Sequence, residues 1–567
     1  MKLFIALSLL TGQTLAILNL TQISFTKLSG CQADNGNTVD AMFQYGAVKA
    51  AFEETYRMLY IIGRPPSGST QKNGCLRIFS GLDSGQPTEQ LSMQLDNPLD
   101  GELLSIAACS NAIALSFSGS NPVSEGHVRM YHPFQFGQST LEPISNEHTF
   151  VGPYPKHMAF TSDCSKIVVA NEGIPGVING QLVDPNGAVS IITRNDGGNP
   201  SVSEVLFDVV NGDNTAAYQQ RGVRYVYRGD SGFTNTLSQD LEPEFVAINV
   251  DDSKAYVILQ ENNALAVIDL LNNNLLDIYA FPEKNWANYQ LDASDTDKQY
   301  QFGHYDVRSF AQPKVMLVTS LFSIPGDAII TANTGARKSF DFGSAGSFSE
   351  GTRLRTLMND QALSPGISQA LVDAINDNSR LGRLYASEND GKNINNNLIE
   401  TIYFYGSRDM AMLSANSSGL FDLFSSGDEL ETSAAAQYND VFNGDTTSTN
   451  SEPTSEMDSR SDDMGPEPMA MAGGSFGSSD IPFLISGSRN GIIYIFTLRT
   501  GFPALESLYR AGNQQGTWNT LYNNDQIGDN IISDMGTIEK GILSANPFIY
   551  VISEASGSFS IYEVREN

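Results

Sequence analysis

Three glutamates occupy matching places in a repeated pattern of apolar runs. Glu172, Glu261 and Glu554 each come just after the second apolar run of a repeat. Equivalent places in repeats arranged around an axis lie on one rim, so these carboxylates are expected to converge around a central channel. Carboxylate oxygens are ligands for a hard cation such as Ca²⁺. Three more glutamates, just before the first run of their repeats, are predicted to join the cluster: Glu242, Glu244 and Glu467.

The same glutamates also have a purely structural interpretation. They could cap strand ends or pair with Arg408 and Arg489. A separate acidic set, Asp292, Asp295 and Asp297, has the spacing of a calcium-binding loop. It lacks the Gly and the final Glu of an EF-hand, so it is a less specific match.

Two short motifs suggest other chemistry. Arg228-Gly229-Asp230 matches an integrin-type adhesion tripeptide, although such short matches often arise by chance. The overlapping Gly229-Asp230-Ser231-Gly232 resembles the nucleophile motif of serine proteases but lacks the following Gly and a matching His. Because there is also no P-loop and no His-Glu-x-x-His, the sequence identifies no catalytic residue and no organic cofactor, and we favour a protein that is not an enzyme.

Charge and composition restrict the partners. The chain has 567 residues, of which 41% are hydrophobic and 17% charged, so it can build a core. It has 33 Lys and Arg against 64 Asp and Glu, a net charge of −31. This excess argues against nucleic acid or an anionic membrane as the main partner. It favours cations, basic proteins or mineral surfaces.

The N-terminal segment indicates an extracellular protein. Residues 1–16 have a charged start, an apolar run and a small-residue cleavage site, which is typical of a signal peptide. No transmembrane segment and no GPI-type tail are predicted. Two sequons, at Asn19 and Asn416, predict glycosylation. Four cysteines predict two disulfides with three possible pairings, the alternative being buried free thiols: Cys31, Cys75, Cys109 and Cys164.

Internal repeats must position all of these residues. Residues 157–192 and 244–269 share one plan of apolar runs separated by polar turns of the Asp-x-Ser/Cys-Lys type, which indicate hairpins. Weaker copies bring the number of units to seven. We therefore predict an all-β fold, a seven-bladed β-propeller, with two β-sandwiches as the alternative. A strand near Ile23–Phe25 is expected to complete the last blade and close the ring.

The remaining length is assigned to insertions. Residues 17–567 are predicted to form a single propeller domain. Residues 352–385 look helical because Ile367, Leu371, Ala374 and Ile375 fall on one face. Residues 428–480 are rich in acidic and small polar side chains and are predicted to be an acidic, flexible loop.

Five short sequence motifs within the repeats resemble those of the choice-of-anchor I domain family. The resemblance extends over nearly the whole mature chain. The motifs are Val169–Gly173, Gln239–Glu244, Leu259–Ala264, Leu291–Asp295 and Ser459–Pro468. Animal members of that family are mesenchyme-specific cell-surface glycoproteins linked to skeleton and shell formation. The resemblance implies a seven-bladed propeller, extracellular display and a role in biomineralisation.

The chain departs from the family pattern near the predicted rim. Asn333-Thr334-Gly335 and Ser488-Arg489 stand where the family usually has Glu, and Met469 replaces a third acidic residue after Glu467. A family cation site would therefore have fewer carboxylates in this chain.

The functional expectation is a secreted extracellular matrix or cell-surface-type glycoprotein that interacts with calcium or a mineral in biomineralisation. Its partners would be calcium or a mineral surface, other matrix proteins and integrin-type receptors. One alternative is a calcium-dependent, phosphoesterase-like hydrolase that uses the channel mouth. Another is a cell-adhesion ligand that acts through Arg228-Gly229-Asp230.

Overall fold

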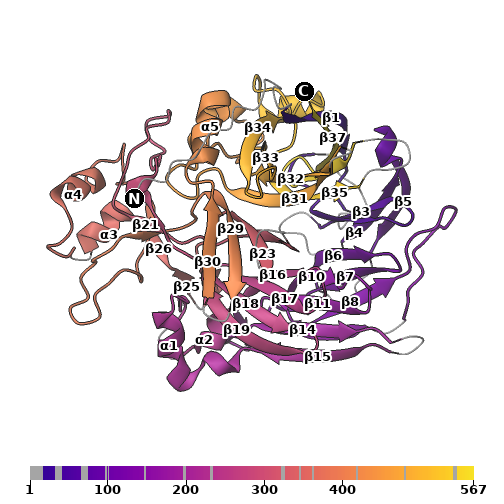
Figure 1. The fold of residues 1–567 in the computed structure, drawn as a ribbon, viewed down its shortest axis with the longest axis horizontal. Helices are drawn as coiled ribbons and strands as arrows, with labels where there is room; N and C mark the ends of the chain where they lie inside the picture. Colours follow the sequence, from indigo (N-terminus) through magenta and orange to yellow (C-terminus); the bar gives the residue numbers. More distant parts are fainter. Residues whose placement is uncertain are drawn as a thin grey trace.

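The fold is described from a computed structural model of the chain. The structure describes residues 17–566 apart from 32–40, 66–73, 96–98, 100, 146–147, 196–198, 230–233, 321–325, 344–345, 361–362, 417–418, 478–479 and 540–545. The signal peptide predicted at 1–16 lies outside the described residues. Figure 1 shows the chain passing around a central region, from indigo through magenta and orange to yellow.

Antiparallel sheets carry most of the described chain, which confirms the expected all-β class. Seven of these sheets have four strands each. The first three comprise β2 (Lys49–Glu53), β3 (Met58–Gly63), β4 (Cys75–Ser80) and β5 (Thr88–Gln94); β6 (Leu103–Cys109), β7 (Ala112–Phe117), β8 (Glu125–Tyr131) and β9 (Thr149–Pro153); and β10 (Pro155–Phe160), β11 (Lys166–Asn171), β14 (Ala188–Thr193) and β15 (Ser201–Leu206).

The other four sheets repeat this plan. They comprise β16 (Pro243–Ile248), β17 (Lys254–Leu259), β18 (Ala264–Asp269) and β19 (Asn274–Ala280); β22 (Val315–Ser320), β23 (Asp327–Asn333), β29 (Asp409–Asn416) and β30 (Gly419–Ser425); β31 (Pro468–Phe476), β32 (Ile481–Ser488), β33 (Ile492–Thr497) and β34 (Ala504–Arg510); and β35 (Ile532–Ile538), β36 (Phe548–Ser553), β37 (Ser558–Glu566) and β1 (Leu18–Lys27).

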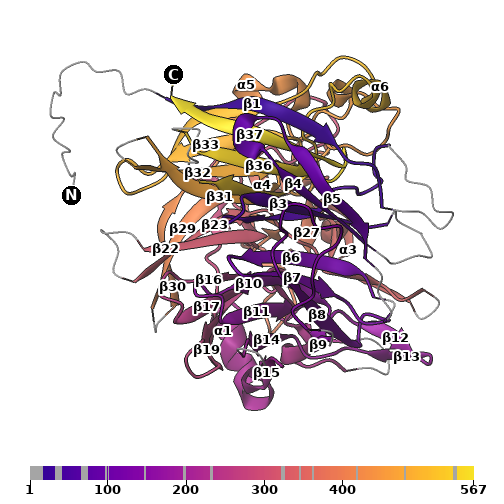
Figure 2. The same cartoon turned by 90° about the vertical axis from the view of Figure 1, so that its right-hand side faces the viewer.

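The first strands of successive sheets contact one another in a closed cycle: β2, β6, β10, β16, β22, β31, β35 and again β2. The last sheet joins the two ends of the described chain, because β1 pairs with β37 from Leu18 opposite Glu566 to Lys27 opposite Ser558. Figure 2 shows these two strands side by side. The N-terminal strand therefore covers an edge of the last sheet, as the sequence predicted.

The predicted hairpin turns form between the first two strands of their sheets. Between β10 and β11, the carboxylate of Asp163 accepts hydrogen bonds from the Thr161 hydroxyl at 2.7 Å and the Ser165 N–H at 2.9 Å. Asp251 accepts from the N–H of Ser253 in the same way between β16 and β17. These short side chains satisfy the turn backbone, which is why the pattern marks hairpins.

The core lies between neighbouring sheets. The second and third strands of a sheet, such as β17 and β18, are buried almost throughout because other sheets cover both of their faces. One cluster joins the third and fourth sheets through residues such as Val168, Val189, Val257 and Ala266. Burial on both faces explains why these strands are continuous apolar runs in the sequence.

Insertions form smaller sheets and short helices. The five-stranded sheet contains β20 (Lys284–Asn285), β21 (Arg308–Ser309), β28 (Tyr403–Phe404), β27 (Tyr385–Ser387) and β26 (Gly351–Arg353). The two-stranded sheets are β12 (Gly176–Ile178) with β13 (Gln181–Val183), and β24 (Ser339–Asp341) with β25 (Ser347–Ser349). The helices include α1 (Thr215–Gln220), α2 (Leu237–Asp240), α5 (Glu429–Gln437) and α6 (Trp518–Asn523).

The segment 352–385, expected to be helical, contains α3 (Leu354–Asp360) and α4 (Gln369–Ile375). Leu371, Ala374 and Ile375 are buried on one face of α4, as their spacing predicted, and Ile367 packs against the same cluster.

The expected acidic loop at 428–480 needs correction, because this segment contains α5 and β31 and many of its polar side chains are buried. Arginines from outside the segment pair with its carboxylates. Arg408 Nη1 lies 2.7 Å from Glu431 Oε1, and Arg489 Nε lies 2.7 Å from Asp445 Oδ1. The composition of the segment alone could not reveal these partners.

Candidate functional site

A cavity of about 490 Å³ lies where the first strands of the seven four-stranded sheets meet. All seven of those strands contribute to its wall. Its titratable lining includes Lys49, Arg64, Glu102, Lys156, His157, Glu244, Lys314, Asp534 and Glu554. The cavity is therefore walled by both signs of charge, including lysines that the repeat pattern had not singled out.

The predicted glutamates do gather near this cavity. Glu172 directly follows β11 and Glu554 directly follows β36, the second strands of their sheets. Glu244, Glu467 and Glu554 all lie within electrostatic reach of Lys314, whose pKa is lowered by burial. Glu242 is close enough to Glu261 and Glu172 for their charges to raise its pKa further, after burial. Two of the six predicted glutamates, Glu244 and Glu554, line the cavity itself.

Basic side chains neutralise four of the six predicted glutamates. Lys156 Nζ lies 2.8 Å from Glu172 Oε2, and Lys338 Nζ lies 3.2 Å from Glu242 Oε2. Arg64 pairs with Glu554, while Glu467 pairs with Arg460 and with Arg489. The pairing with Arg489 follows the structural interpretation of these glutamates, whereas Arg408 pairs with Glu431 instead.

Glu244 and Glu261 form the remaining pair of rim carboxylates. Burial, followed by the charge of Glu261, raises the pKa of Glu244 to about 8. Glu261 Oε2 is buried and accepts no hydrogen bond. Across the described residues, no three His, Cys, Asp or Glu side chains are arranged around a metal position. Calcium binding at the rim therefore stays a prediction.

The rim lysines are functional candidates that the analysis of the sequence missed. Lys156 and Lys314 each follow a proline. Pro155-Lys156 begins β10, and Pro313-Lys314 directly precedes β22. Glu244 follows Pro243 at the corresponding place of another sheet. The repeat argument that located the glutamates could have located these lysines.

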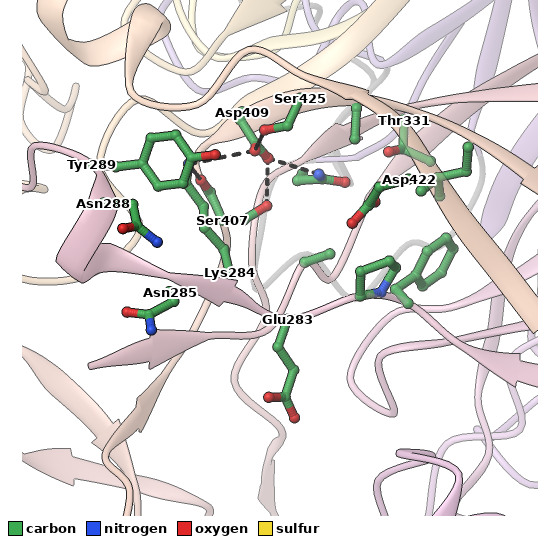
Figure 3. Close-up of a pocket in the computed structure, with 16 residues that line it drawn as sticks. Glu283, Lys284, Asn285, Asn288, Tyr289, Thr331, Ser407, Asp409, Asp422 and Ser425 are labelled. Carbon is green, nitrogen blue, oxygen red and sulfur yellow. Dashed lines mark hydrogen bonds and ion pairs between the residues drawn. The ribbon is translucent and has the colours of Figure 1, made fainter. Parts of the chain in front are cut away.

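A second cavity, of about 210 Å³, lies beside β20 and the sheet of β22, β23, β29 and β30. Figure 3 shows Asp409 close to Ser407 and Ser425 on one side of it. Lys284 Nζ donates to the carbonyl oxygens of Ser407 at 2.7 Å and Gly427 at 2.6 Å. Burial lowers the pKa of Lys284.

Asp409 is held by several donors. Its carboxylate accepts hydrogen bonds from the Ser407 hydroxyl, from Asn333 Nδ2 at 2.8 Å and from the Ser425 hydroxyl at 2.6 Å. These donors compensate the buried carboxylate and join β23, β29 and β30, the strands that carry Asn333, Asp409 and Ser425. Asp409 and its three donors therefore stabilise the contact between neighbouring strands. No sequence motif had pointed to these residues.

The four cysteines form two disulfides, Cys31–Cys75 and Cys109–Cys164. The prediction of two disulfides is confirmed, the alternative of free thiols is excluded, and the pairing is now resolved. The second bond links the end of β6 to the turn between β10 and β11, and so connects two adjacent sheets.

The predicted modification and adhesion residues lie at the surface where they can be described. Asn19 is half-buried in β1, and Asn416 is exposed at the end of β29. Arg228 is exposed, with its guanidinium 4.9 Å from the centre of the Tyr225 ring. Gly229 adjoins it, but Asp230 lies outside the described residues. Glycosylation and adhesion stay predictions.

No helix in the described part of the chain has the length and apolar character needed to cross a membrane.

Comparison with known proteins gives two named relatives. A Strongylocentrotus purpuratus protein named "Mesenchyme-specific cell surface glycoprotein" is 30% identical over 325 residues, which are 54% of this chain and 42% of that protein. The match therefore spans less than half of that relative. A Magallana gigas protein named "Gigasin-3a" is 28% identical over 203 residues, which are 34% of this chain and 68% of that protein.

Solved structures give distant likenesses. A Chaetomium thermophilum Raptor structure has a TM-score of 0.41 at 7% identity, covering 97% of this chain and 30% of that chain. A Myceliophteria thermophila Cps50 (Swd1) β-propeller domain has a TM-score of 0.38 at 8% identity, covering 97% of this chain and 100% of that chain.

The strongest result comes from the family comparison. The model of the choice-of-anchor I domain matches residues 48–500, which span six of the seven four-stranded sheets almost completely. This chain belongs to the choice-of-anchor I domain family.

Proposed function

We propose that this protein is a secreted, cell-surface-type glycoprotein that interacts with calcium ions or a calcium mineral in biomineralisation. The observation that carries the proposal is a net charge of −31 on a chain related to a protein named as a cell surface glycoprotein. We also propose that the seven four-stranded sheets are the seven blades of one propeller, because their first strands contact one another in a closed cycle.

Extracellular location is supported by two disulfides, which persist in oxidising compartments. The signal-peptide pattern at residues 1–16 and the exposed Asn416 agree with passage through a secretory route.

Surface carboxylates, rather than the rim, are the more effective contact for a mineral. The rim glutamates are mostly paired with Lys or Arg, so their charge is already compensated. Many other acidic side chains are exposed on several sheets and insertions. Examples are Glu54, Glu89, Glu125, Glu204, Asp213 and Asp373. Many weak contacts of this kind bind a repeating mineral face through multivalency.

The test uses the full chain, expressed in animal cells from its own N-terminus. The expected result is protein in the medium that begins at Ile17 and increases in gel mobility after N-glycosidase treatment. This protein should then sediment with calcium carbonate crystals more than an unrelated secreted protein of equal net charge. Retention in the cytosol would overturn the extracellular assignment. Sedimentation equal to that of the charge-matched protein would overturn the mineral role.

A further inference from the structure

Two aspartates from distant parts of the sequence are buried next to each other. Asp292 follows Leu291, which pairs with Gly303 in a short bridge. Asp458 lies in the acidic segment, where its N–H donates to the Phe442 carbonyl at 2.7 Å. Asp292 is 1% exposed and Asp458 is 0% exposed. Both carboxylates are thus removed from water.

None of the oxygens of these two carboxylates accepts a hydrogen bond. Both carboxylate oxygens of Asp297 are also buried and unpartnered, as are Glu431 Oε2 and Asn443 Oδ1. All of these atoms are acceptors. Buried acceptors without donors are expensive, and buried carboxylates are normally paired or bound to a metal.

The carboxylates act on one another electrostatically. Burial and then the charge of Glu431 raise the pKa of Asp292. Burial and then the charge of Asp292 raise the pKa of Asp458. Asp297 adds to both increases. The group is therefore a single electrostatically coupled cluster, in which ionising all of its members at once is unfavourable without a cation.

Arg408 lies beside this cluster and lowers the pKa of Asp292, but most of its hydrogen bonds go to backbone oxygens. Arg408 Nη1 donates to Glu431 Oε1 and to the carbonyl oxygen of Asp292, both at 2.7 Å. Arg408 Nη2 donates to the carbonyl oxygens of Ser461 at 2.8 Å and Asp463 at 2.9 Å. These donors hold the backbone around the cluster and leave the carboxylates of Asp292 and Asp458 unpaired.

Asp295 shows what a neutralised aspartate in the same loop looks like. Its two carboxylate oxygens accept from Arg383 Nε at 2.7 Å and Arg383 Nη2 at 2.6 Å. Asp292 and Asp297, on either side of it, have no such partner. Of the three aspartates of this loop, Asp295 is therefore ion-paired, whereas the carboxylates of Asp292 and Asp297 have no hydrogen-bond donor.

We propose that Asp292, Asp297 and Asp458 bind one Ca²⁺, with Glu431 and Asn443 as additional oxygen ligands. An all-oxygen set from irregular backbone suits Ca²⁺, which accepts six to eight oxygens in flexible geometry, better than Mg²⁺ or a transition metal. Because no three His, Cys, Asp or Glu side chains in the described ranges already surround a metal position, binding must draw these carboxylates together.

This ion would join the loop at 291–297 to the acidic segment. The site is separate from the rim and from the exposed carboxylates, so it goes beyond the proposed function and does not depend on mineral binding. The proposed extracellular location supplies the calcium.

The experiment is thermal melting of the mature chain after treatment with a chelator, with Ca²⁺ or Mg²⁺ added alone. A ligand that binds the folded state raises its melting temperature. We expect a saturable increase with Ca²⁺ and a much smaller one with Mg²⁺. Asp458→Asn should abolish the increase, because the amide removes one anionic ligand of the ion. Asp295→Asn, the matched control from the same loop, should keep the increase.

Equal calcium effects in the wild type and in Asp458→Asn would overturn the proposal. Loss of the effect only in the rim variant Glu172→Gln/Glu261→Gln/Glu554→Gln would move the ion to the rim and would also overturn it. If Asp458→Asn does not fold, calorimetric titration of the wild type with Ca²⁺ decides, and absence of saturable binding refutes the site. Failure of mineral sedimentation alone leaves this result unaffected, so the two proposals are distinguished.

Discussion

The ammonium group of Lys156 lies 2.8 Å from a carboxylate oxygen of Glu172, and Lys156 forms part of the wall of the central cavity. This pair shows how the rim is built. Glu172 directly follows β11, as the repeats predicted. Lys156, in the adjacent strand β10 of the same sheet, compensates its charge. The rim is therefore a belt of ion pairs around one pair of facing carboxylates, Glu244 and Glu261.

Lys156→Gln should destabilise the protein because it leaves Glu172 buried without its cation. Removing one partner of a fully buried pair costs several kcal/mol. The lysine side chain is 36% exposed, so we expect a smaller loss of about 2 kcal/mol in the free energy of unfolding. Chemical denaturation measures it. The control is Lys254→Gln, because Lys254 is 3.9 Å from Asp327 at a more exposed place and should cost less than about 1 kcal/mol. Equal losses of unfolding free energy in Lys156→Gln and Lys254→Gln would show that the pair at the rim stabilises the fold no more than an exposed pair does.

Acid should weaken the fold through His127. This residue in β8 is fully buried, stacks on Phe117 and has no hydrogen-bond partner for either ring nitrogen. Burial, with the charges of His148 and Arg129, lowers its pKa to about 4. The imidazole of His127 binds its proton more readily in the unfolded chain than in the folded chain. Its contribution to the free energy of unfolding is therefore fully present above the unfolded-state pKa and is lost as the pH falls from there through the folded-state pKa.

The expected contribution of His127 is a loss of about 2 kcal/mol between about pH 7 and about pH 5. His127→Phe should remove this part of the pH dependence, as measured by urea unfolding at several pH values. His132→Phe, at an exposed position, should retain it. An unchanged acid slope in His127→Phe would contradict the assignment.

The disulfide between Cys109 and Cys164 should stabilise two adjacent sheets against separation. Its sequence separation is 55 residues, and the loop-entropy relation gives about 4 kcal/mol for a loop of that size. The double variant Cys109→Ala/Cys164→Ala is expected to lose about that much in denaturant unfolding. The pair Cys31 and Cys75, with a separation of 44, should give a similar value. A loss below about 1 kcal/mol would mean that the unfolded chain is not restricted by this bond.

Removing β1 should make the protein associate. This strand covers the outer strand of the last sheet, and an uncovered edge offers free backbone donors and acceptors to another chain. A chain that starts at residue 28 is expected to form oligomers or aggregates in light scattering. The chain that starts at residue 17 should not, and a monomeric shortened chain would show that β1 is dispensable.

The sheets could be predicted from the sequence because their signals are local. The turns at Asp163 and Asp251 satisfy their own backbone, and the apolar runs of the inner strands reflect burial on both faces. The acidic segment was predicted wrongly for the opposite reason. Its carboxylates are neutralised by Arg408 and Arg489, which lie outside the segment in sequence.

The candidate sites were predictable only in part. Repeat position drew attention to the rim glutamates and could also have located Lys156 and Lys314, but the pairing of Lys338 with Glu242 emerges only in three dimensions. The spacing of Asp292 and Asp297 pointed to calcium, while their neighbour Asp458 comes from more than a hundred residues away. Local sequence has no means of showing such a pairing.

The proposal that this acidic protein binds calcium can be decided by equilibrium dialysis of the mature chain against radioactive calcium at physiological ionic strength. We expect saturable uptake of about one ion per chain, followed by weaker binding that declines as salt screens the surface carboxylates. Uptake no greater than that of an unrelated acidic protein of equal net charge, at every calcium concentration, would contradict it.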